Sequence, residues 1–322
     1  MLLLLYFVAR WQRTSFRKQW MCYDHFGRGT NVLTALDVPL LRSWLWRIGR
    51  GLYMYARRDA PNDPGRNGEY WLLDLVVSSR IEGEIMLLDV GANRGEWSHR
   101  ACELMREHSV VGTVFAVEPP GAAAEFLRIR FRDETSLHIL PVAMSDKPGD
   151  ADFFVIGAMA GTNSLLDSGL GTRVRVPTTT VDEFCRERSI HRLLFVKTDT
   201  EGNDMAVLRG AARSLYDGII DVWQFEYNHR WAFGRYLLKD VFEFIQDKPY
   251  TVGKLYGYGI EKLKGWHPEL ERFFEGNYVL LRKGSTLDAR FGSYEFDSSN
   301  ALRKTSAWKT SQMNSRTIKE RV

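Results

Sequence analysis

The stretch from Ile85 to Arg100 constrains the fold of this chain more than any other. Its apolar start, 85–88, is too short for a typical helix and ends in Asp89, a pattern that favours a strand buried on both faces of a parallel sheet. Gly91 and Gly95 then bracket a tight turn, and helix-compatible residues follow. A strand, a glycine turn and a helix start bring free backbone N–H groups to one place, where they can meet a ligand.

Strands and helices alternate regularly after this turn. Four further apolar segments predict parallel strands, and 204–216 predicts a helix between the last two. The strands are expected at 110–117, 137–142, 193–198 and 218–225. Two extended segments, 152–156 and 173–179, predict an inserted hairpin around a glycine-rich loop. Late strands near 250–256 and 277–281 complete an α/β, doubly wound, Rossmann-like sheet whose last strand is antiparallel.

The flanks of this region differ from it in composition. Residues 1–68 predict a helical N-terminal extension, and residues 284–322, rich in Ser, Thr, Asn and Arg, predict a mobile tail. Within the extension, 41–58 predicts a basic amphipathic helix, with apolar residues on one stripe and arginines opposite. We expect it to pack on the domain, with a membrane surface or another protein as the alternative partner. The apolar run 2–9 is too short to cross a bilayer.

Charge is distributed unevenly along the chain. Residues 1–60 carry ten Lys and Arg against three Asp and Glu, whereas 61–282 carry 26 against 33. A nucleic-acid substrate calls for a basic body, so this acidic body argues against DNA or RNA. The three cysteines, Cys22, Cys102 and Cys185, are widely spaced and form no metal or disulfide motif. They fit a reducing compartment, and we predict a cytoplasmic protein that is either free or membrane-associated.

Acidic residues end the predicted parallel strands, where ligands bind in sheets of this kind. Glu118 ends the second strand, where a carboxylate can bind a ribose diol. The turn reads GxxxG rather than the GxGxxG of a pyrophosphate site, and the acid before it suits a cationic ligand. S-adenosylmethionine carries a sulfonium, an ammonium and a ribose, so we predict it as the cofactor.

The segment Leu88-Asp89-Val90-Gly91-Ala92-Asn93-Arg94-Gly95 resembles the first motif of the FkbM-type methyltransferases, and Val117-Glu118-Pro119 resembles their second-strand acid. Residues 143–146 are similar to their third-strand end. The segment 196–204, Val-Lys-Thr-Asp-Thr-Glu-Gly-Asn-Asp, resembles the family's strongest signature, Lys-x-Asp-x-Glu-Gly. The resemblance covers about residues 70–282. It implies a seven-stranded class I methyltransferase domain, taken here as 69–283, and methyl transfer to a hydroxyl of a sugar, polyketide or similar small acceptor.

Matching the motifs residue by residue gives a set of cofactor-binding candidates on the glycine turn, the helix after it and the next two strand ends. They are Asp89, Gly91, Ala92, Asn93, Gly95, Trp97, Ser98, Glu118, Ala143, Ser145 and Asp146. Residues 161–165 resemble a small-residue loop of the family and predict either a lid or a plain hairpin connection.

Methyl transfer to a hydroxyl mainly needs alignment of donor and acceptor, aided by a base. Asp199 is the first candidate for the base, followed by Glu201, Glu226 and His229. Lys197 lies one strand repeat before Asp199 and is expected to orient its carboxylate. A buried ion-pair network is an equally good interpretation of Lys197 and Glu226. We predict no metal site, although Asp199, Glu226 and Asn228 are an alternative oxygen set for magnesium.

Two other functions remain open from the sequence alone. A nicotinamide-dependent oxidoreductase shares the strand-end acid but calls for GxGxxG and a substrate domain. A non-catalytic binding module would keep the fold without the reaction.

Overall fold

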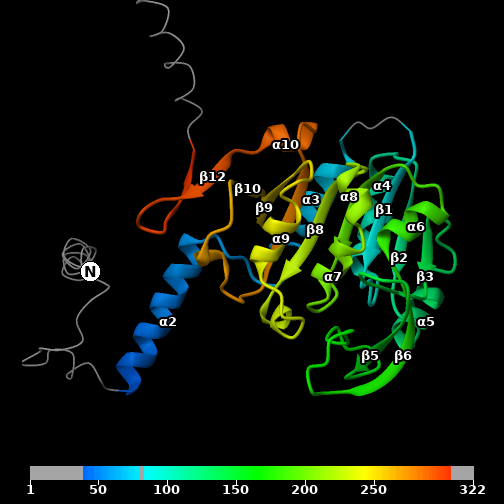
Figure 1. The fold of residues 1–322 in the computed structure, drawn as a ribbon, viewed down its shortest axis with the longest axis horizontal. Coiled ribbons are helices and arrows are strands. Elements are labelled where there is room, and N and C mark those ends of the chain that lie inside the picture. Colours follow the sequence, from blue (N-terminus) through cyan, green and yellow to red (C-terminus); the bar gives the residue numbers. More distant parts are fainter. Residues whose placement is uncertain (1–38, 80–82, 306–322) are drawn as a thin grey trace, which may run out of the picture. The chain divides into compact units, whose positions relative to one another are not determined.

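Strand β1 (Ile85–Val90) lies inside a ten-stranded sheet in the computed structural model, which describes residues 39–79 and 83–305 (Figure 1). Its neighbours β2 (Gly112–Val117) and β7 (Leu193–Thr198) both run parallel to it. Because side chains alternate along a strand, Leu88 and Val90 pack into one core and Ile85 and Leu87 into another. The prediction of a strand buried on both faces is confirmed.

The sheet contains the seven expected strands in the order β3-β2-β1-β7-β8-β11-β9. Besides β1, β2 and β7, these strands are β3 (Leu137–Leu140), β8 (Ile220–Tyr227), β9 (Tyr250–Tyr256) and β11 (Gly276–Arg282). Strand β11 runs antiparallel to β8, as predicted. Three short strands that the sequence analysis missed extend the sheet beyond β9: β10 (Gly259–Leu263), β12 (Ser293–Phe296) and β13 (Leu302–Lys304). The fold class is confirmed, but the sheet has ten strands rather than seven.

Helices cover both faces of the sheet (Figure 1). One core takes its helical side chains from α3 (Glu69–Val77), α4 (Glu96–Glu107) and α5 (Ala122–Arg130). The other takes them from α6 (Val181–Glu187), α7 (Asp204–Arg209), α8 (Ala212–Tyr216) and α9 (Leu238–Phe244). The single helix predicted for 204–216 is divided in two at Gly210. A Cβ there would lie 2.1 Å from the Ser145 carbonyl oxygen, so the backbone passes too close for a side chain.

A second, three-stranded sheet contains the inserted hairpin. Strands β5 (Gly149–Val155) and β6 (Thr172–Thr179) pair antiparallel, and β4 (Ala143–Met144) pairs parallel with β6. The predicted hairpin is therefore confirmed. Its loop folds back on the strand, because Phe154 and Ser164 form an isolated antiparallel bridge.

The prediction of a mobile tail is wrong for residues 284–305. They form α10 (Thr286–Arg290), β12 and β13, and β12 pairs with β10. A few apolar side chains hold this polar segment in place: Leu287 and Phe291 pack against one core, and Phe296 and Leu302 against the other. The rest of the predicted tail, 306–322, lies outside the described residues.

The predicted boundary of the N-terminal extension also changes. The chain divides into two units between Tyr53 and Met54, so residues 54–68 belong with the sheet. Asp59 explains this, because it forms ion pairs with Lys254 and Arg272 of the second unit. The apolar run 2–9 lies outside the described residues.

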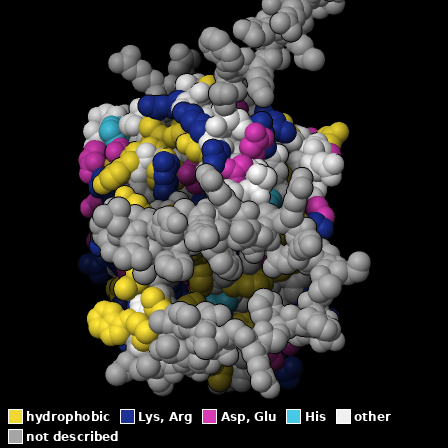
Figure 2. Space-filling model, turned by 90° about the vertical axis from the view of Figure 1, so that its left-hand side faces the viewer, with side chains coloured by type: hydrophobic (Ala, Val, Ile, Leu, Met, Phe, Trp, Pro, Cys, Tyr) yellow, Lys and Arg dark blue, Asp and Glu magenta, His cyan; other side chains and the backbone are white. Residues whose placement is uncertain are grey.

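Helix α2 (Pro39–Ala56) corresponds to the predicted basic amphipathic helix. Its large apolar side chains are exposed, including Trp44, Trp46, Ile48 and Leu52, and hydrophobic side chains at the surface are visible in Figure 2. Among the helices of the described residues, none is long and apolar enough to span a membrane. Two short 3-10 helices, η2 (His229–Ala232) and η3 (Pro268–Leu270), follow β8 and β10.

Candidate active site

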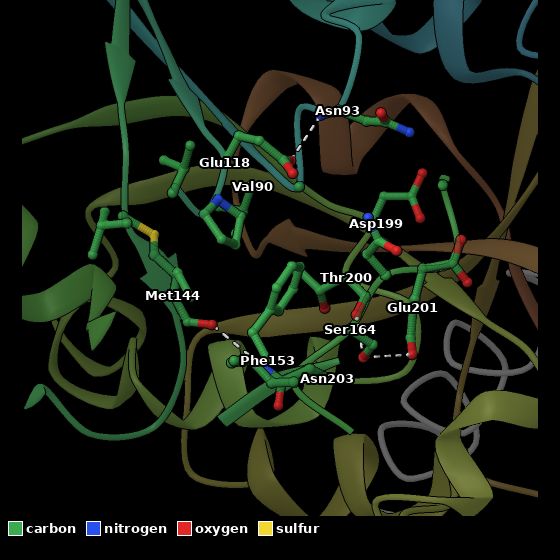
Figure 3. Close-up of a pocket in the computed structure, with 18 of the residues that line it drawn as sticks. Val90, Asn93, Glu118, Met144, Phe153, Ser164, Asp199, Thr200, Glu201 and Asn203 are labelled. Carbon is green, nitrogen blue, oxygen red and sulfur yellow. Dashed lines mark hydrogen bonds between the residues drawn. The ribbon is translucent and has the colours of Figure 1, made fainter. Parts of the chain in front are cut away.

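A cleft of about 500 Å³ opens at the carboxyl ends of β1, β2 and β7 (Figure 3). Gly91, Glu118 and Asp199 line it, one after each strand. Glu118 and Asp199 therefore border the same cavity although 81 positions separate them in the chain. We call this hollow the deep cleft.

The two glycines of the turn are required by close packing. A Cβ on Gly91 would lie 2.1 Å from the Asp199 carbonyl oxygen, and one on Gly95 would lie 2.5 Å from the Phe131 ring. Both glycines have positive φ, 82° and 74°, which side chains rarely adopt. Gly91 lines the deep cleft, whereas Gly95 packs behind it at the start of α4. The turn brings β1 and β7 close enough for both to reach the cleft.

Glu118 is held in place by the glycine turn. Its carboxylate accepts a hydrogen bond of 2.9 Å from the Asn93 backbone N–H (Figure 3). Burial raises the pKa of the Glu118 carboxyl to about 7, although the Asn93 hydrogen bond favours the ionised form. Asn93 also lines the cleft, and its buried side-chain oxygen has no hydrogen-bond partner among the residues that the structure describes. Both oxygens can accept hydrogen bonds from a ligand with hydroxyl or ammonium groups.

Asp89 lies beneath the turn rather than in the cleft. It is fully buried, and one carboxylate oxygen accepts a hydrogen bond of 2.6 Å from Ser98. Burial raises its pKa, opposed by the nearby charge of Lys197. Asp89 therefore supports the start of α4 through Ser98 and does not line the cleft.

The structure separates the predicted cofactor residues into two groups. Gly91, Asn93, Glu118 and Ala143 line the deep cleft. Seven others do not line it: Asp89, Ala92, Gly95, Trp97, Ser98, Ser145 and Asp146. Trp97 is buried against Phe195, with ring centroids 5.3 Å apart, and the Asp146 side chain is exposed. The chain turns away from the cleft after Met144, because Ser145 pairs with Thr179 of β6.

Sequence reasoning did not name Phe153 of the inserted hairpin or Met144 of β4 as cleft residues. It named Asn163 and Ser164, which also line the cleft, only as part of the loop 161–165. The Ser164 hydroxyl donates to the carbonyl oxygens of Thr200 and Glu201, each at 3.2 Å, so the hairpin loop is tied to the turn after β7. Only the small-residue loop 161–165 gave a sequence signal, because nothing local indicates where a hairpin folds back.

A second hollow of about 690 Å³ adjoins the deep cleft, and Asp199 and Glu201 line both. We call it the carboxylate pocket. All five predicted catalytic residues line it, namely Lys197, Asp199, Glu201, Glu226 and His229. Its other residues come from loops, from the start of α3, from η2 and from β11: Asn62, Glu69, Thr162, Asn228, Arg230, Glu275 and Asn277. The sequence analysis named Asn228 as an alternative magnesium ligand and included Thr162 in the loop 161–165, but it did not indicate the other five.

Lys197 is a buried cation that contacts Asp199. Its ammonium nitrogen lies 3.2 Å from the Asp199 carboxylate. Burial acts to lower the pKa of Lys197, but the charges of Asp199 and Asp89 outweigh it and raise the pKa above the usual value. Lys197 therefore stays charged and fixes the direction of the Asp199 carboxylate.

Two further acids of the pocket, Glu201 and Glu226, have raised pKa values. Burial, and then the Asp199 charge, raises the pKa of Glu201 to about 7, against an ion pair of 2.9 Å with Arg230. Burial, and then the charges of Asp199 and Glu275, raises the pKa of Glu226 well above its usual value. His229 is exposed on η2 at the rim. The pocket thus combines two carboxyls with raised pKa values, Glu201 and Glu226, with Asp199, whose carboxylate contacts the Lys197 ammonium.

The deep cleft is suited to a cationic ligand. Among the described residues that line it, three are acids, Glu118, Asp199 and Glu201, and none is Lys or Arg. A pyrophosphate would be repelled there, whereas a sulfonium and an ammonium would be attracted. The unpartnered Asn93 oxygen and the Glu118 carboxylate are the hydrogen-bond acceptors that S-adenosylmethionine calls for. The residues present therefore fit this cofactor.

Within residues 39–79 and 83–305, no group of three or more His, Cys, Asp or Glu side chains is arranged to hold a metal ion. Asp199 belongs to the alternative magnesium set considered above, and its carboxylate contacts the Lys197 ammonium instead.

The order of the strands, the glycine corner and the acid that ends β2 together define a class I methyltransferase fold, whose cofactor is S-adenosylmethionine. The model of the methyltransferase FkbM domain matches residues 89–252, half of the sequence. The chain belongs to this family, and the predicted family and cofactor are confirmed. No curated protein sequence matches the chain well enough to count as a relative.

Solved structures resemble the chain only loosely. A methyltransferase FkbM from Methylobacillus flagellatus shares 14% identity at a TM-score of 0.39, over 74% of this chain and 60% of its own. A SAM-dependent methyltransferase from Agrobacterium tumefaciens shares 11% at 0.37, over 67% and 61%. A putative rRNA methylase from Clostridium thermocellum shares 10% at 0.38, over 68% and 98%. The chain thus spans about three-fifths of the first two proteins, and likenesses this loose say nothing about its substrate.

Proposed function

We propose that this methyltransferase transfers a methyl group to a hydroxyl oxygen of a saccharide or a similar small polyhydroxylated acceptor. The carboxylate pocket supports this proposal, because it meets the deep cleft at Asp199 and Glu201 and is lined by carboxylates and carboxamides. Such groups bind hydroxyls by accepting and donating hydrogen bonds. Its cations, Lys197 and Arg230, are already paired with acids, so an anionic acceptor gains little there.

Bound S-adenosylmethionine supplies a methyl group on a positively charged sulfur, ready for in-line displacement. In the proposal, Glu118 and Asn93 hold the adenosyl donor, and the acidic lining complements its charge. Asp199, at the junction of the two hollows, accepts the proton of the acceptor hydroxyl as the bond to carbon forms. Lys197 orients Asp199. Glu226, Glu201 and His229 are second candidates for the proton acceptor or for hydroxyl binding.

The two other functions considered from the sequence, a nicotinamide-dependent oxidoreductase and a non-catalytic binding module, find less support. The acidic lining of the deep cleft disfavours the pyrophosphate of a nicotinamide cofactor. A non-catalytic module does not call for a carboxylate at the junction of two hollows. The cytoplasmic location, with or without membrane association, and a membrane or protein partner for α2 remain proposals.

The test of this function is methyl transfer by the full-length protein. We expect S-adenosylmethionine, and not NAD, to bind in calorimetry, and S-adenosylhomocysteine to form when a panel of saccharides, polyketides and RNA oligonucleotides is supplied. A methylated sugar hydroxyl, located by mass spectrometry and NMR, supports the proposal. Cofactor binding with transfer only to RNA or to nitrogen or carbon atoms would refute it.

A further inference from the structure

Helix α2 carries an apolar stripe along its length. Successive residues of a helix lie about 100° apart around its axis, so side chains three and four positions apart share one face. On α2 this face is made of Leu41, Trp44, Leu45, Ile48, Leu52 and Tyr55. Each of the six residues is at least 36% exposed, and Tyr55 reaches 86%. We call this face the α2 stripe. Contiguous apolar surface that is exposed in this way marks an interaction site.

The rest of the α2 surface is positively charged. Arg42, Arg47 and Arg50 lie outside the stripe and are exposed, and the 18 residues of the helix contain no Asp or Glu. A surface that complements this helix presents apolar groups to the stripe and negative charge beside it. A bilayer that contains anionic phospholipids does both, because its charged headgroups lie directly above the hydrocarbon.

The tryptophans of α2 fit the headgroup layer of such a bilayer. Trp44 lies at the edge of the stripe, whereas Trp46 lies between Arg42 and Arg50 around the helix. The two residues are 61% and 65% exposed. An indole ring among arginines leaves apolar surface in water, but the boundary between headgroups and hydrocarbon is where Trp side chains gather in membrane proteins. A membrane surface therefore accommodates Trp46 together with the arginines on either side of it.

The arginines also determine how the helix lies in the bilayer. Arg42, Arg47 and Arg50 are spread along α2, so a helix that crossed the bilayer would place their charges in the hydrocarbon. A helix that lies in the plane of the membrane instead buries the stripe at the headgroup boundary and keeps the arginines beside the lipid phosphates.

We propose that α2 binds this methyltransferase to the surface of bilayers that contain anionic phospholipids. The α2 stripe enters the headgroup boundary, and the arginines supply the preference for negative charge. The proposal concerns where the enzyme works and is independent of the acceptor proposed above.

The test is sedimentation of the full-length protein with vesicles of phosphatidylcholine, either alone or mixed with phosphatidylserine. We expect binding to be at least about tenfold tighter with phosphatidylserine, and to weaken as salt screens the charges. Ile48→Glu should weaken binding at least about tenfold, because it replaces an inserted apolar side chain by a charge. Arg47→Gln should weaken it about fivefold, since one basic residue near an anionic surface is worth about 1 kcal/mol.

Matched controls come from exposed residues of other helices. Ile129→Glu on α5 and Arg213→Gln on α8 should leave vesicle binding unchanged. Calorimetry with S-adenosylmethionine shows whether each variant is folded. All four variants keep residues 1–38, including the apolar run 2–9, so weaker binding of Ile48→Glu assigns the membrane contact to α2.

Three results would overturn the proposal. If the full-length protein binds neither kind of vesicle, a protein surface covers the stripe; self-association that Ile48→Glu abolishes would identify that surface as a second copy of the chain. If Ile48→Glu and Arg47→Gln bind vesicles as tightly as the unsubstituted protein, the membrane contact lies on another part of the chain. Equal binding to vesicles with and without phosphatidylserine would show that the arginines do not meet lipid charge.

Discussion

At the scale of single residues, the site depends on carboxylates whose neighbours differ. Glu118 accepts a backbone N–H and lies in an acidic lining, whereas Asp199 is in contact with the Lys197 ammonium. Burial raises the pKa of Glu118 to about 7, so near neutral pH this carboxyl exists in both forms. A cation bound beside it would favour the ionised form. Two acids at equivalent strand ends can therefore serve different roles.

Replacing Glu118 by alanine tests its role in cofactor binding. We expect Glu118→Ala to weaken the binding of S-adenosylmethionine about 10- to 100-fold, since a charged hydrogen bond is worth about 1.5–3 kcal/mol. Titration calorimetry measures the change. Glu125→Ala, an exposed acid on α5, is the matched control. Unchanged affinity in the Glu118 variant would mean that the cofactor binds elsewhere.

Replacing Asp199 by asparagine tests the proposed base. Asp199→Asn keeps the shape of the side chain but cannot take up the proton, so kcat should fall about 10²- to 10⁴-fold. The dissociation constant of S-adenosylmethionine should change much less. Asp217→Asn, an exposed acid after α8, is the control. Near-normal kcat in the Asp199 variant would mean that Asp199 is not the base and that Glu226, Glu201 or His229 is.

At the scale of elements, the turn after β1 positions the site by close packing. Gly91 can be predicted from the sequence as part of a ligand-binding turn, but the atom that it contacts, the Asp199 carbonyl oxygen, lies on a strand far along the chain. Parallel strands of one sheet end at the same edge, which explains why the two segments meet. The glycine is needed as much for this contact as for a ligand.

A methyl group on Gly91 should therefore disturb the fold. With a Cβ 2.1 Å from a carbonyl oxygen and a φ of 82°, Gly91→Ala should lower the free energy of unfolding by about 2 kcal/mol or more. Gly265→Ala is the control, because a Cβ there meets nothing within 4 Å. Denaturant unfolding of both variants measures the effect. Equal stability of the two would show that this turn has more space than the structure gives it.

The segment after β11 is a second element whose role can be tested. The comparison is between a chain that ends at Thr305 and one that ends at Lys283. The shorter chain should unfold several degrees lower, because it loses α10, β12 and their apolar contacts with the two cores. Thermal unfolding of the two truncated proteins makes the comparison. A mobile tail, as the composition suggests, predicts no difference between them.

At the scale of the whole molecule, the site stores unfavourable electrostatic energy in the absence of ligand. The pKa values of Glu118 and Glu201 rise from 4.5 to about 7, and that of Asp204 from 3.8 to about 6, each mainly through burial. Between about pH 4.5 and 7 the folded protein therefore holds more protons than the unfolded chain does. The free energy of unfolding that these groups contribute therefore falls as the pH rises from about 4.5 to about 7.

We therefore expect the ligand-free protein to be more stable at pH 5.5 than at pH 8, by about 1–3 kcal/mol, since one pKa unit corresponds to about 1.4 kcal/mol. Urea unfolding at the two pH values measures the difference. Glu118→Gln should reduce the pH dependence, because an amide does not titrate. Greater stability at pH 8 than at pH 5.5 would contradict the acidic character of the site.

The sequence by itself determined the sheet, the inserted hairpin, the glycine turn and the acids that end the strands, because buried strands and tight turns leave a local pattern of apolar residues and glycines. It also determined the family, through motifs that stay contiguous in the chain. The sequence did not predict the three edge strands or the ordered segment 284–305, since short polar strands show little periodicity. Only the tertiary structure decided that Asp89 lies beneath the site, that Asp146 faces away, and that Asp199 and Glu201 join two hollows. The reason is physical: a pocket forms where distant segments leave space between them, and no local pattern of residues specifies that space.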